Sequence, residues 1–171
     1  MKRDSNTTDE RFRLQLHDSG VTVVVAAGND ADDAYNYSPA CVRQAITVAS
    51  SNIEDAKVGS SNYGPAVDIF AAGWNVISTW NDGSTKMLSG TSMATAHVAG
   101  FAAYLLGLDS TTTPAQVAHW MVQEKSLKNV LVDVREFFLT TYCMFDLRTL
   151  KLVPLVAALT ANRLLNSDLL A

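Results

Sequence analysis

Two polar residues stand at the borders of apolar segments, and their types suit chemistry at a carbonyl group. Ser92 opens a run that reaches Leu106 and is almost wholly small or apolar. A helix of that composition has no polar face, so we expect it to be buried all round. Ser92 then lies at the helix N-terminus, where unpaired N–H groups and the helix dipole stabilise negative charge on a reacting oxygen. The alternative is that Ser92 is only an N-cap, a common role for serine.

Asn29 follows a second apolar segment. Residues 21–25 form a continuous run of valine and threonine, which predicts a strand buried on both faces of a parallel sheet. Residues 26–28 are small and end the strand, and α/β proteins place ligand-contacting groups at such strand ends. The amide of Asn29 can donate a hydrogen bond to a reacting oxygen there. Taken alone, residues 28–30 fit an ordinary turn that closes a strand.

Several motifs together resemble the subtilisin-like serine proteases, and most of all their proteinase K branch. The nucleophile motif of that family matches SGTSMATAHVAG at residues 89–100, and its oxyanion-hole motif matches GVTVVVAAGN at residues 20–29. The resemblance runs from Gly20 to Leu106 without an evident gap. Further matching stretches follow the family's order at residues 36–40, 46–48, 61–64 and 67–70.

The resemblance implies a fold and a set of roles. The fold is α/β, a parallel sheet with helices on both faces. Ser92 is the nucleophile, Asn29 supplies an oxyanion-hole donor, and the backbone at Ala26 and Gly28 forms a wall of the primary specificity pocket. Substrates are polypeptides, with a loose preference for apolar or aromatic side chains before the cut, and the chemistry requires no cofactor.

The same resemblance implies a structural calcium site. The matching ligands are the carboxylate of Asp68 and the main-chain carbonyls of Arg43 and Ala45. Oxygen ligands suit calcium. The alternative is a solvated Asp68 side chain without a metal, because one carboxylate makes only a modest site.

The chain departs from the family pattern in small ways and in one large way. Ala96 replaces the proline that usually precedes the histidine after the nucleophile, and Ile46 stands near the position of a disulfide-forming cysteine. Cys41 and Cys143 are the only two cysteines, too few for a disulfide framework. The large departure concerns the catalytic triad.

A serine hydroxyl needs an adjacent base, held in the right tautomer. The family order is Asp, then His, then Ser, yet only His17 precedes Ser92. His97 lies about 140° round the helix from Ser92 and matches a structural histidine of the family. His119 lies in a later helix. The triad is therefore absent as a set, and we expect this chain to be inactive in isolation.

The length and the C-terminal part suggest an incomplete domain. The chain has 171 residues, and the resemblance implies that it begins near the middle of a peptidase domain, without the domain's N-terminal half. We assign residues 1–135 to the C-terminal part of the peptidase domain, with a helix that Thr113 caps and a strand at 129–134. Residues 136–160 are an insert unlike the family, either translated intron or a genuine amphipathic insertion. Residues 161–171 resemble the family's C-terminus.

Composition excludes some partners. The formal net charge is −4 and no lysine or arginine cluster is present, so nucleic-acid binding has no support. The charges and Pro154 within the insert argue against a membrane span. The charged N-terminus has no apolar core and is not a secretory signal, although the family is secreted or vacuolar. A missing N-terminal half or a pro-segment is the expected protein partner.

Two function classes therefore remain open. The first is a serine endopeptidase by family, with Ser92 as nucleophile. The second is a non-catalytic pseudoenzyme fragment that binds a peptide or a complementary chain. A third outcome is that no stable protein is made.

Overall fold

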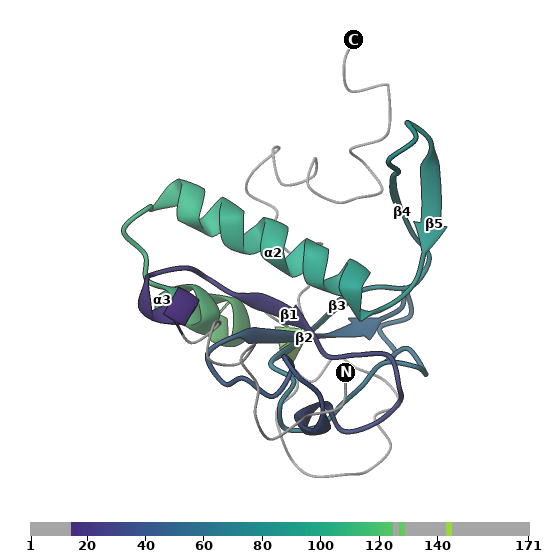
Figure 1. Cartoon of the computed structure of the whole chain (residues 1–171), viewed down its shortest axis with the longest axis horizontal. Helices are drawn as coiled ribbons and strands as arrows, with labels where there is room; N and C mark the ends of the chain where they lie inside the picture. Colours follow the sequence, from purple (N-terminus) through teal and green to yellow (C-terminus); the bar gives the residue numbers. More distant parts are fainter. Residues whose placement is uncertain (1–14, 125–126, 129–142, 145–171) are drawn as a thin grey trace.

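A parallel sheet forms the centre of the computed structural model, which describes residues 15–124, 127–128 and 143–144 (Figure 1). The strand order is β1 (Val24–Ala26), β2 (Ile46–Ser51), β3 (Ile69–Ala72), β7 (Cys143–Met144) and β6 (Leu127–Lys128). The pairs β1–β2, β2–β3 and β3–β7 are parallel, and β6 is antiparallel to β7. The predicted α/β class with a parallel sheet is confirmed.

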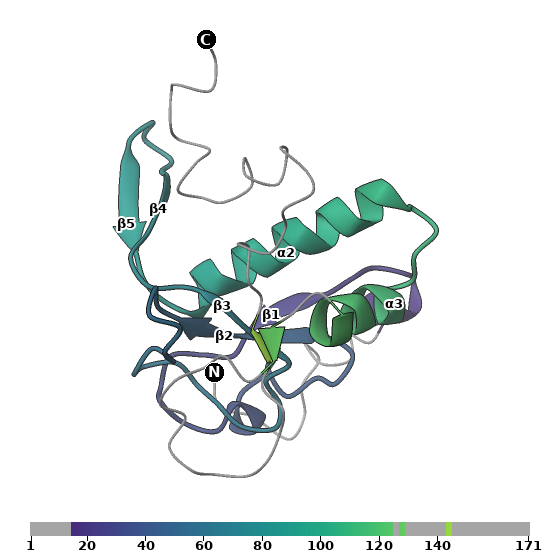
Figure 2. The same ribbon diagram turned by 180° about the vertical axis from the view of Figure 1, so that it is seen from behind.

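Helices pack on one face of this sheet. Figures 1 and 2 show α2 (Thr91–Leu108) lying across it, with α3 (Pro114–His119) near one end and the π-helix η2 (Trp120–Glu124) continuing from α3. The largest core cluster joins these helices to β2 and β3. Its buried members are Ile46, Val48, Ile69, Ala71, Ala94, Val98, Phe101, Ala102, Leu105, Val117 and Met121.

The opposite face carries a second, smaller core. The parallel register sets Val48 beside Ile69 and Ala49 beside Phe70, so alternate side chains point to opposite faces. Phe70 is fully buried on this second face, under the 3₁₀-helix η1 (Ala34–Asn36) and its flanking loops. In the described ranges this face is therefore covered by η1 and loops, where the sequence predicted helices on both faces.

Two predicted elements are less buried than expected. The helix that Ser92 opens is not buried all round, because Ala99 and Ala103 on its outer side are exposed. The predicted strand at 21–25 shortens to β1, and Val21 is 45% exposed. Both elements are exposed because each has a packing partner on one side only. β1 is the edge strand and pairs with β2 alone, and α2 contacts the sheet through one of its sides.

The start of the later helix is as predicted. The Thr113 hydroxyl accepts the N–H of Gln116, the Gln116 side chain accepts from the Thr113 N–H, and Pro114 takes the first helical position. Val117 and Met121 are fully buried. The strand predicted at 129–134 lies outside the described residues, as do the proposed boundaries at 135 and 160.

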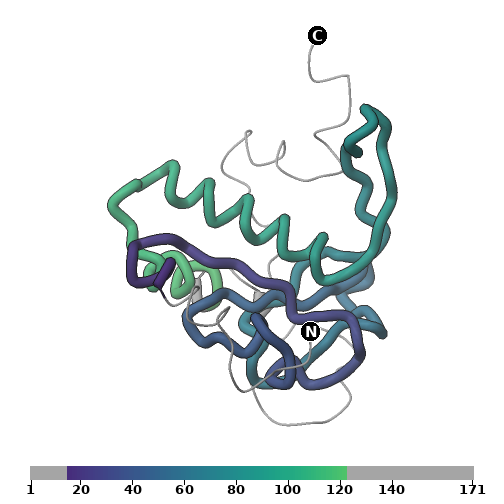
Figure 3. Tube along the Cα trace, in the orientation of Figure 1, coloured from purple at the N-terminus to yellow at the C-terminus, as the bar shows by residue number. Residues whose placement is uncertain are grey.

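An antiparallel hairpin leads into α2. β4 (Val76–Thr79) pairs with β5 (Thr85–Leu88), and Figure 3 traces the chain from this projecting hairpin directly into the helix. By length and composition alone α2 could cross a membrane. Its buried side chains instead belong to the main core of the sheet.

Candidate active site

A tight turn fixes Ser92 in the first turn of α2. The N-cap of α2 is Gly90, so the interpretation of Ser92 as a mere N-cap is wrong. The Gly90 N–H donates to the Gly73 carbonyl at 2.7 Å, and Gly90 has φ +148°. A Cβ at Gly73 would lie 2.6 Å from the Gly90 carbonyl oxygen, so only glycine permits this close approach of the two backbones. The Ser92 side chain is exposed beside the turn.

Asn29 reaches the same turn from the end of β1. Its Oδ1 accepts the N–H of Thr91 at 2.9 Å, although 62 positions separate the two residues in the chain. In return the Thr91 hydroxyl accepts the N–H of Gly28 at 3.2 Å. Thr91 is fully buried, whereas Asn29 is exposed. These two hydrogen bonds hold the loop at the end of β1 against the N-terminus of α2.

Two N–H donors at the N-terminus of α2 have no hydrogen-bond partner among the described residues. Because Asn29 Oδ1 is engaged, the Asn29 amide nitrogen points elsewhere, and it has no hydrogen-bond partner within the described ranges. The Ser92 N–H likewise has no hydrogen-bond partner in these ranges, whereas the Met93 N–H donates to the Gly90 carbonyl. Unpaired donors at a helix N-terminus favour a developing negative charge. The arrangement suits an oxyanion formed when a hydroxyl attacks a carbonyl.

The Asn62 side chain holds the loop that follows β1 through three hydrogen bonds. Its Oδ1 accepts the N–H groups of Asp30 and Asp32 at 2.9 and 3.1 Å, and its Nδ2 donates to the Ala27 carbonyl at 2.9 Å. The side chain is fully buried. A buried amide that is satisfied at both ends is a strong local constraint, because leaving it unpaired is costly. The position of Asn29 therefore depends on a residue from a different loop.

The predicted pocket wall lies in this loop. Ala26 and Gly28 are both half-buried next to Asn29. Gly28 has φ +105°, and a Cβ at this position would collide with Nδ2 of Asn62. Glycine is therefore required at position 28 for two reasons, the backbone conformation and the space. A role of Ala26 and Gly28 in substrate binding stays a prediction.

None of the three histidines is bonded to Ser92. All three lie in the described ranges, and Ser92 has no hydrogen-bonded or ionic partner there. His97 Nδ1 bonds to the Ala72 carbonyl at 2.9 Å, so this nitrogen carries the proton. Burial lowers the pKa of His97, against the opposing effect of that hydrogen bond. His97 is thus a neutral side chain that anchors α2 to the end of β3.

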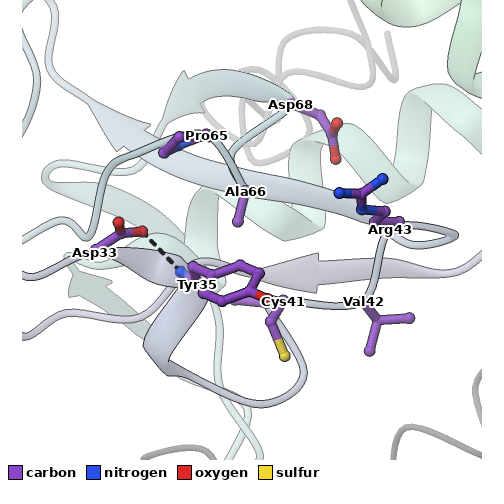
Figure 4. Close-up of a pocket in the computed structure, with 9 residues that line it drawn as sticks. Asp33, Tyr35, Cys41, Val42, Arg43, Pro65, Ala66 and Asp68 are labelled. Atoms are coloured by element: carbon purple, nitrogen blue, oxygen red, sulfur yellow. Dashed lines mark hydrogen bonds between the residues drawn. The ribbon is translucent and has the colours of Figure 1, made fainter. Parts of the chain in front are cut away.

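Two of the predicted calcium ligands, Asp68 and Arg43, line a cavity of about 700 Å³ on the other side of the sheet (Figure 4), whereas Ala45 is not among its lining residues. Burial raises the pKa of Asp68 to about 6, while the Thr47 N–H, 2.7 Å from Oδ2, lowers it in part. Neither the Arg43 nor the Ala45 carbonyl accepts a hydrogen bond within the described part of the chain. Two unengaged carbonyls and a carboxylate form a donor set that fits a calcium ion.

One feature of the cavity opposes a cation. The Arg43 side chain lies at the same end of the cavity as Asp68, as Figure 4 shows. Its positive charge would have to turn away when a metal ion binds. Arg43 is exposed, so solvent can receive the guanidinium. The described residues contain no group of three or more His, Cys, Asp or Glu side chains that could hold a metal.

Thr91 and Asn62 are site residues to which sequence reasoning gave no role. Both occur within matched motifs, and both form hydrogen bonds that hold Asn29 or its neighbours in place. The usable signal is that each is a polar residue with 0% exposure, which calls for specific partners. That burial becomes visible only once the fold is known.

Comparison with known proteins identifies relatives along most of the chain. The model described as "Subtilase family" matches residues 2–142. The "Cuticle-degrading protease" of Metarhizium anisopliae is 53% identical over 119 residues, which are 70% of this chain and 30% of that protein. "Proteinase T" of Parengyodontium album is 43% identical over 130 residues, which are 76% of this chain and 43% of that protein.

A solved structure agrees with these matches. The crystal structure of a cold adapted subtilisin-like serine proteinase superposes with a TM-score of 0.78 at 38% identity. The match covers 84% of this chain and 51% of that protein chain. This chain therefore spans about half of the solved neighbour and less than half of these curated relatives.

Proposed function

Because the chain belongs to the subtilase family, we propose that it acts as a serine-type endopeptidase with Ser92 as nucleophile and Asn29 in the oxyanion hole. One observation carries the proposal. Ser92 is exposed in the first turn of α2, and two donors at this end of the helix, the Ser92 N–H and the Asn29 amide, have no partner among the described residues; the hydrogen bond from Thr91 orients the Asn29 amide. The substrates are polypeptides, whose scissile carbonyl lies between Ser92 and Asn29.

The proposed chemistry assigns each group one task. Ser92 Oγ forms a bond to the carbonyl carbon while its proton passes to a base. The carbonyl oxygen becomes negative and accepts hydrogen bonds from Asn29 Nδ2 and the Ser92 N–H. Collapse of this intermediate expels the amine, which takes up the proton, and water then hydrolyses the ester on Ser92. Thr91 acts as a positioning residue, because it touches Asn29 and Gly28 and not the reacting atoms.

The described residues bring no base to the Ser92 hydroxyl. His97 is committed to the Ala72 carbonyl, and Ser92 has no histidine partner in the described ranges. A hydroxyl without a base is a poor nucleophile. This favours a second candidate function, a non-catalytic chain that binds a peptide or a complementary protein segment through the same loops. The two candidates differ in whether Ser92 becomes covalently modified.

The test is labelling of the full chain with a fluorophosphonate probe, with and without imidazole as an external base. We expect slow labelling that imidazole accelerates and that Ser92→Ala abolishes. The matched control Ser110→Ala removes an exposed serine in the turn after α2 and should label like the parent chain. Asn29→Ala should slow labelling by about 10²–10³-fold, which is the known cost of losing the oxyanion-hole asparagine in subtilisin itself.

A chain that is folded by circular dichroism and unlabelled with imidazole present would overturn the endopeptidase proposal and leave the peptide-binding alternative. Labelling that survives in Ser92→Ala would place the reactive hydroxyl elsewhere.

We also propose that Asp68 and the carbonyls of Arg43 and Ala45 hold a structural calcium ion. The support is the oxygen donor set and the cavity beside it. When bound, the ion would favour the ionised form of Asp68 and tie the loop before β2 to the start of β3. The reaction at Ser92 does not depend on it.

The proposed location is the secretory or vacuolar route, by family. The observation behind this is the family match itself. Immunoblotting of culture medium and vacuolar fractions tests the proposal, which fails if the chain is found in neither.

A further inference from the structure

The cavity on the face of the sheet that carries η1 has room for more than a metal ion. Its volume of about 700 Å³ lies within the range of cavities that bind small organic molecules. Charged and apolar side chains line it together, as Figure 4 shows. Such a lining is typical of a site that recognises a ligand with a polar head and an apolar body.

Two side chains of opposite charge face each other across one end of this cavity without forming an ion pair. In Figure 4 the Arg43 guanidinium and the Asp68 carboxylate are turned toward each other. Neither of them has an ionic partner in the part of the chain that the structure describes. The Thr47 N–H, 2.7 Å from Oδ2 of Asp68, holds that carboxylate in place. The space between the two charges therefore suits a ligand that carries a positive and a negative group of its own.

The wall beside this charged pair is apolar. It is formed by the side chains of Tyr35, Ala40, Pro65 and Ala66. Tyr35 is 52% exposed, so part of its ring can receive a ligand. Asp33, on the opposite side of Tyr35 from Arg43 in Figure 4, already accepts the Tyr35 N–H at 2.9 Å. Aromatic or apolar groups of a ligand would be stabilised by contact with this wall.

We propose that this cavity binds a free α-amino acid with an aromatic or large apolar side chain. Its ammonium group lies at Asp68, its carboxylate lies at Arg43, and its side chain packs along Tyr35. The ligand matches the cavity because an α-amino acid bears both charges on a single carbon atom, with the apolar group next to them. A metal ion or an inorganic anion would engage only one of the two charged side chains.

This binding site is separate from the proposed chemistry at Ser92. The cavity is lined by η1 and by the loops before β2 and β3, on the face of the sheet opposite α2. It shares Asp68 with the proposed calcium site, so a calcium ion and the amino acid would exclude each other there. A chelator is therefore present in every titration, and labelling of Ser92 plays no part in the test.

The experiment is an NMR titration of the full chain with three compounds of the same skeleton. They are L-phenylalanine, 3-phenylpropionate, which lacks the amine, and 2-phenylethylamine, which lacks the carboxylate. We expect L-phenylalanine to bind with a dissociation constant of about 1 mM and to shift the amide signals of residues that line the cavity. Loss of the ammonium group, which faces the half-buried Asp68, should weaken binding about tenfold. Loss of the carboxylate, which faces the exposed Arg43, should weaken it about threefold to fivefold.

Two substitutions connect these differences to the two side chains. Asp68→Asn keeps an acceptor for the Thr47 N–H and should bring the affinities for L-phenylalanine and 3-phenylpropionate close together. Arg43→Gln should do the same for L-phenylalanine and 2-phenylethylamine, and it changes an exposed residue, so it tests the inference even if Asp68→Asn does not fold. The control Asp82→Asn, in the β4–β5 hairpin, should keep both parent ratios. The inference fails if L-phenylalanine shifts no signals of the cavity, if the parent chain binds the three compounds equally, or if Arg43→Gln leaves the ratios unchanged.

Discussion

The carboxamide oxygen of Asn29 accepts the backbone N–H of Thr91 at 2.9 Å, and this contact helps to join the end of β1 to the start of α2. It has two effects. It satisfies one of the N–H groups that a helix N-terminus leaves unpaired. It also turns the amide nitrogen of Asn29 away from Thr91, and this nitrogen has no hydrogen-bond partner among the residues that the structure describes. The same hydrogen bond serves stability and the proposed chemistry.

The reciprocal contact predicts the effect of Thr91→Val. Valine keeps the shape of threonine but cannot accept the Gly28 N–H, which would lose its partner beside a buried side chain. We expect a loss of about 1–3 kcal/mol in the free energy of unfolding, measured by urea denaturation. Imidazole-dependent labelling of Ser92 should also slow.

The matched control for Thr91 is Thr95→Val. The Thr95 hydroxyl only donates to a helical carbonyl one turn back, at 2.7 Å. Its removal leaves no buried donor unpaired, so the effect should stay below about 1 kcal/mol. Equal losses in the two variants would contradict the role given to the Thr91 hydroxyl.

Gly28→Ala should destabilise the chain more than Gly20→Ala. Both glycines have positive φ, +105° and +84°, so both variants suffer backbone strain of about 1–3 kcal/mol. The added Cβ meets Asn62 at position 28 but nothing within 4 Å at position 20. We expect a further loss of about 1–2 kcal/mol for Gly28→Ala in urea denaturation, because Asn62 must shift and release its hydrogen bonds. Similar midpoints for the two variants would disprove the collision.

Stability should fall as the pH decreases below the ordinary histidine pKa of 6.5 because of His97. Burial lowers the folded-state pKa of this residue, so on acidification the unfolded chain binds its proton first. The destabilisation is absent above pH 6.5, grows as the pH falls, and levels off below the folded-state pKa. Urea unfolding across this range should show a weaker pH dependence for His97→Gln, since glutamine cannot be protonated. An unchanged slope in His97→Gln would contradict the prediction.

Calcium removal should lower the melting temperature if Asp68 holds the ion. Binding to the folded chain alone stabilises it by mass action, and each kcal/mol corresponds to about 2–4 °C for a chain of this size. Calorimetry with calcium and with a chelator measures the difference. Asp68→Asn keeps an acceptor for the Thr47 N–H but removes the charge, so the calcium effect should largely disappear. Asp109→Asn, at the exposed end of α2, should preserve it, and a melting temperature indifferent to calcium in the parent would refute the site.

The ends of helices and strands could be predicted from the sequence, because they depend on local stereochemistry. The Thr113 and Pro114 signals identified the start of α3, because caps and proline act within one helical turn. Ser92 was placed at the beginning of α2 for the same reason, although the cap itself is Gly90. The end of β1 before Asn29 followed from the change from β-branched to small residues. The family motifs at residues 20–29 and 89–100 then gave the expected roles of Asn29 and Ser92.

Burial and partner choice could not be predicted in the same way. An all-apolar α2 was expected to be buried all round, yet only one side faces the sheet, because burial depends on how many elements a fold brings to that helix. The hydrogen bond between Asn29 and Thr91 and the one from Asn62 to Ala27 join residues from distant segments of the chain. The sequence by itself determined the family, the sheet class and the local position of Ser92. Only the tertiary structure decided which donors at the N-terminus of α2 have no partner among the described residues, because this depends on contacts between residues far apart in the chain.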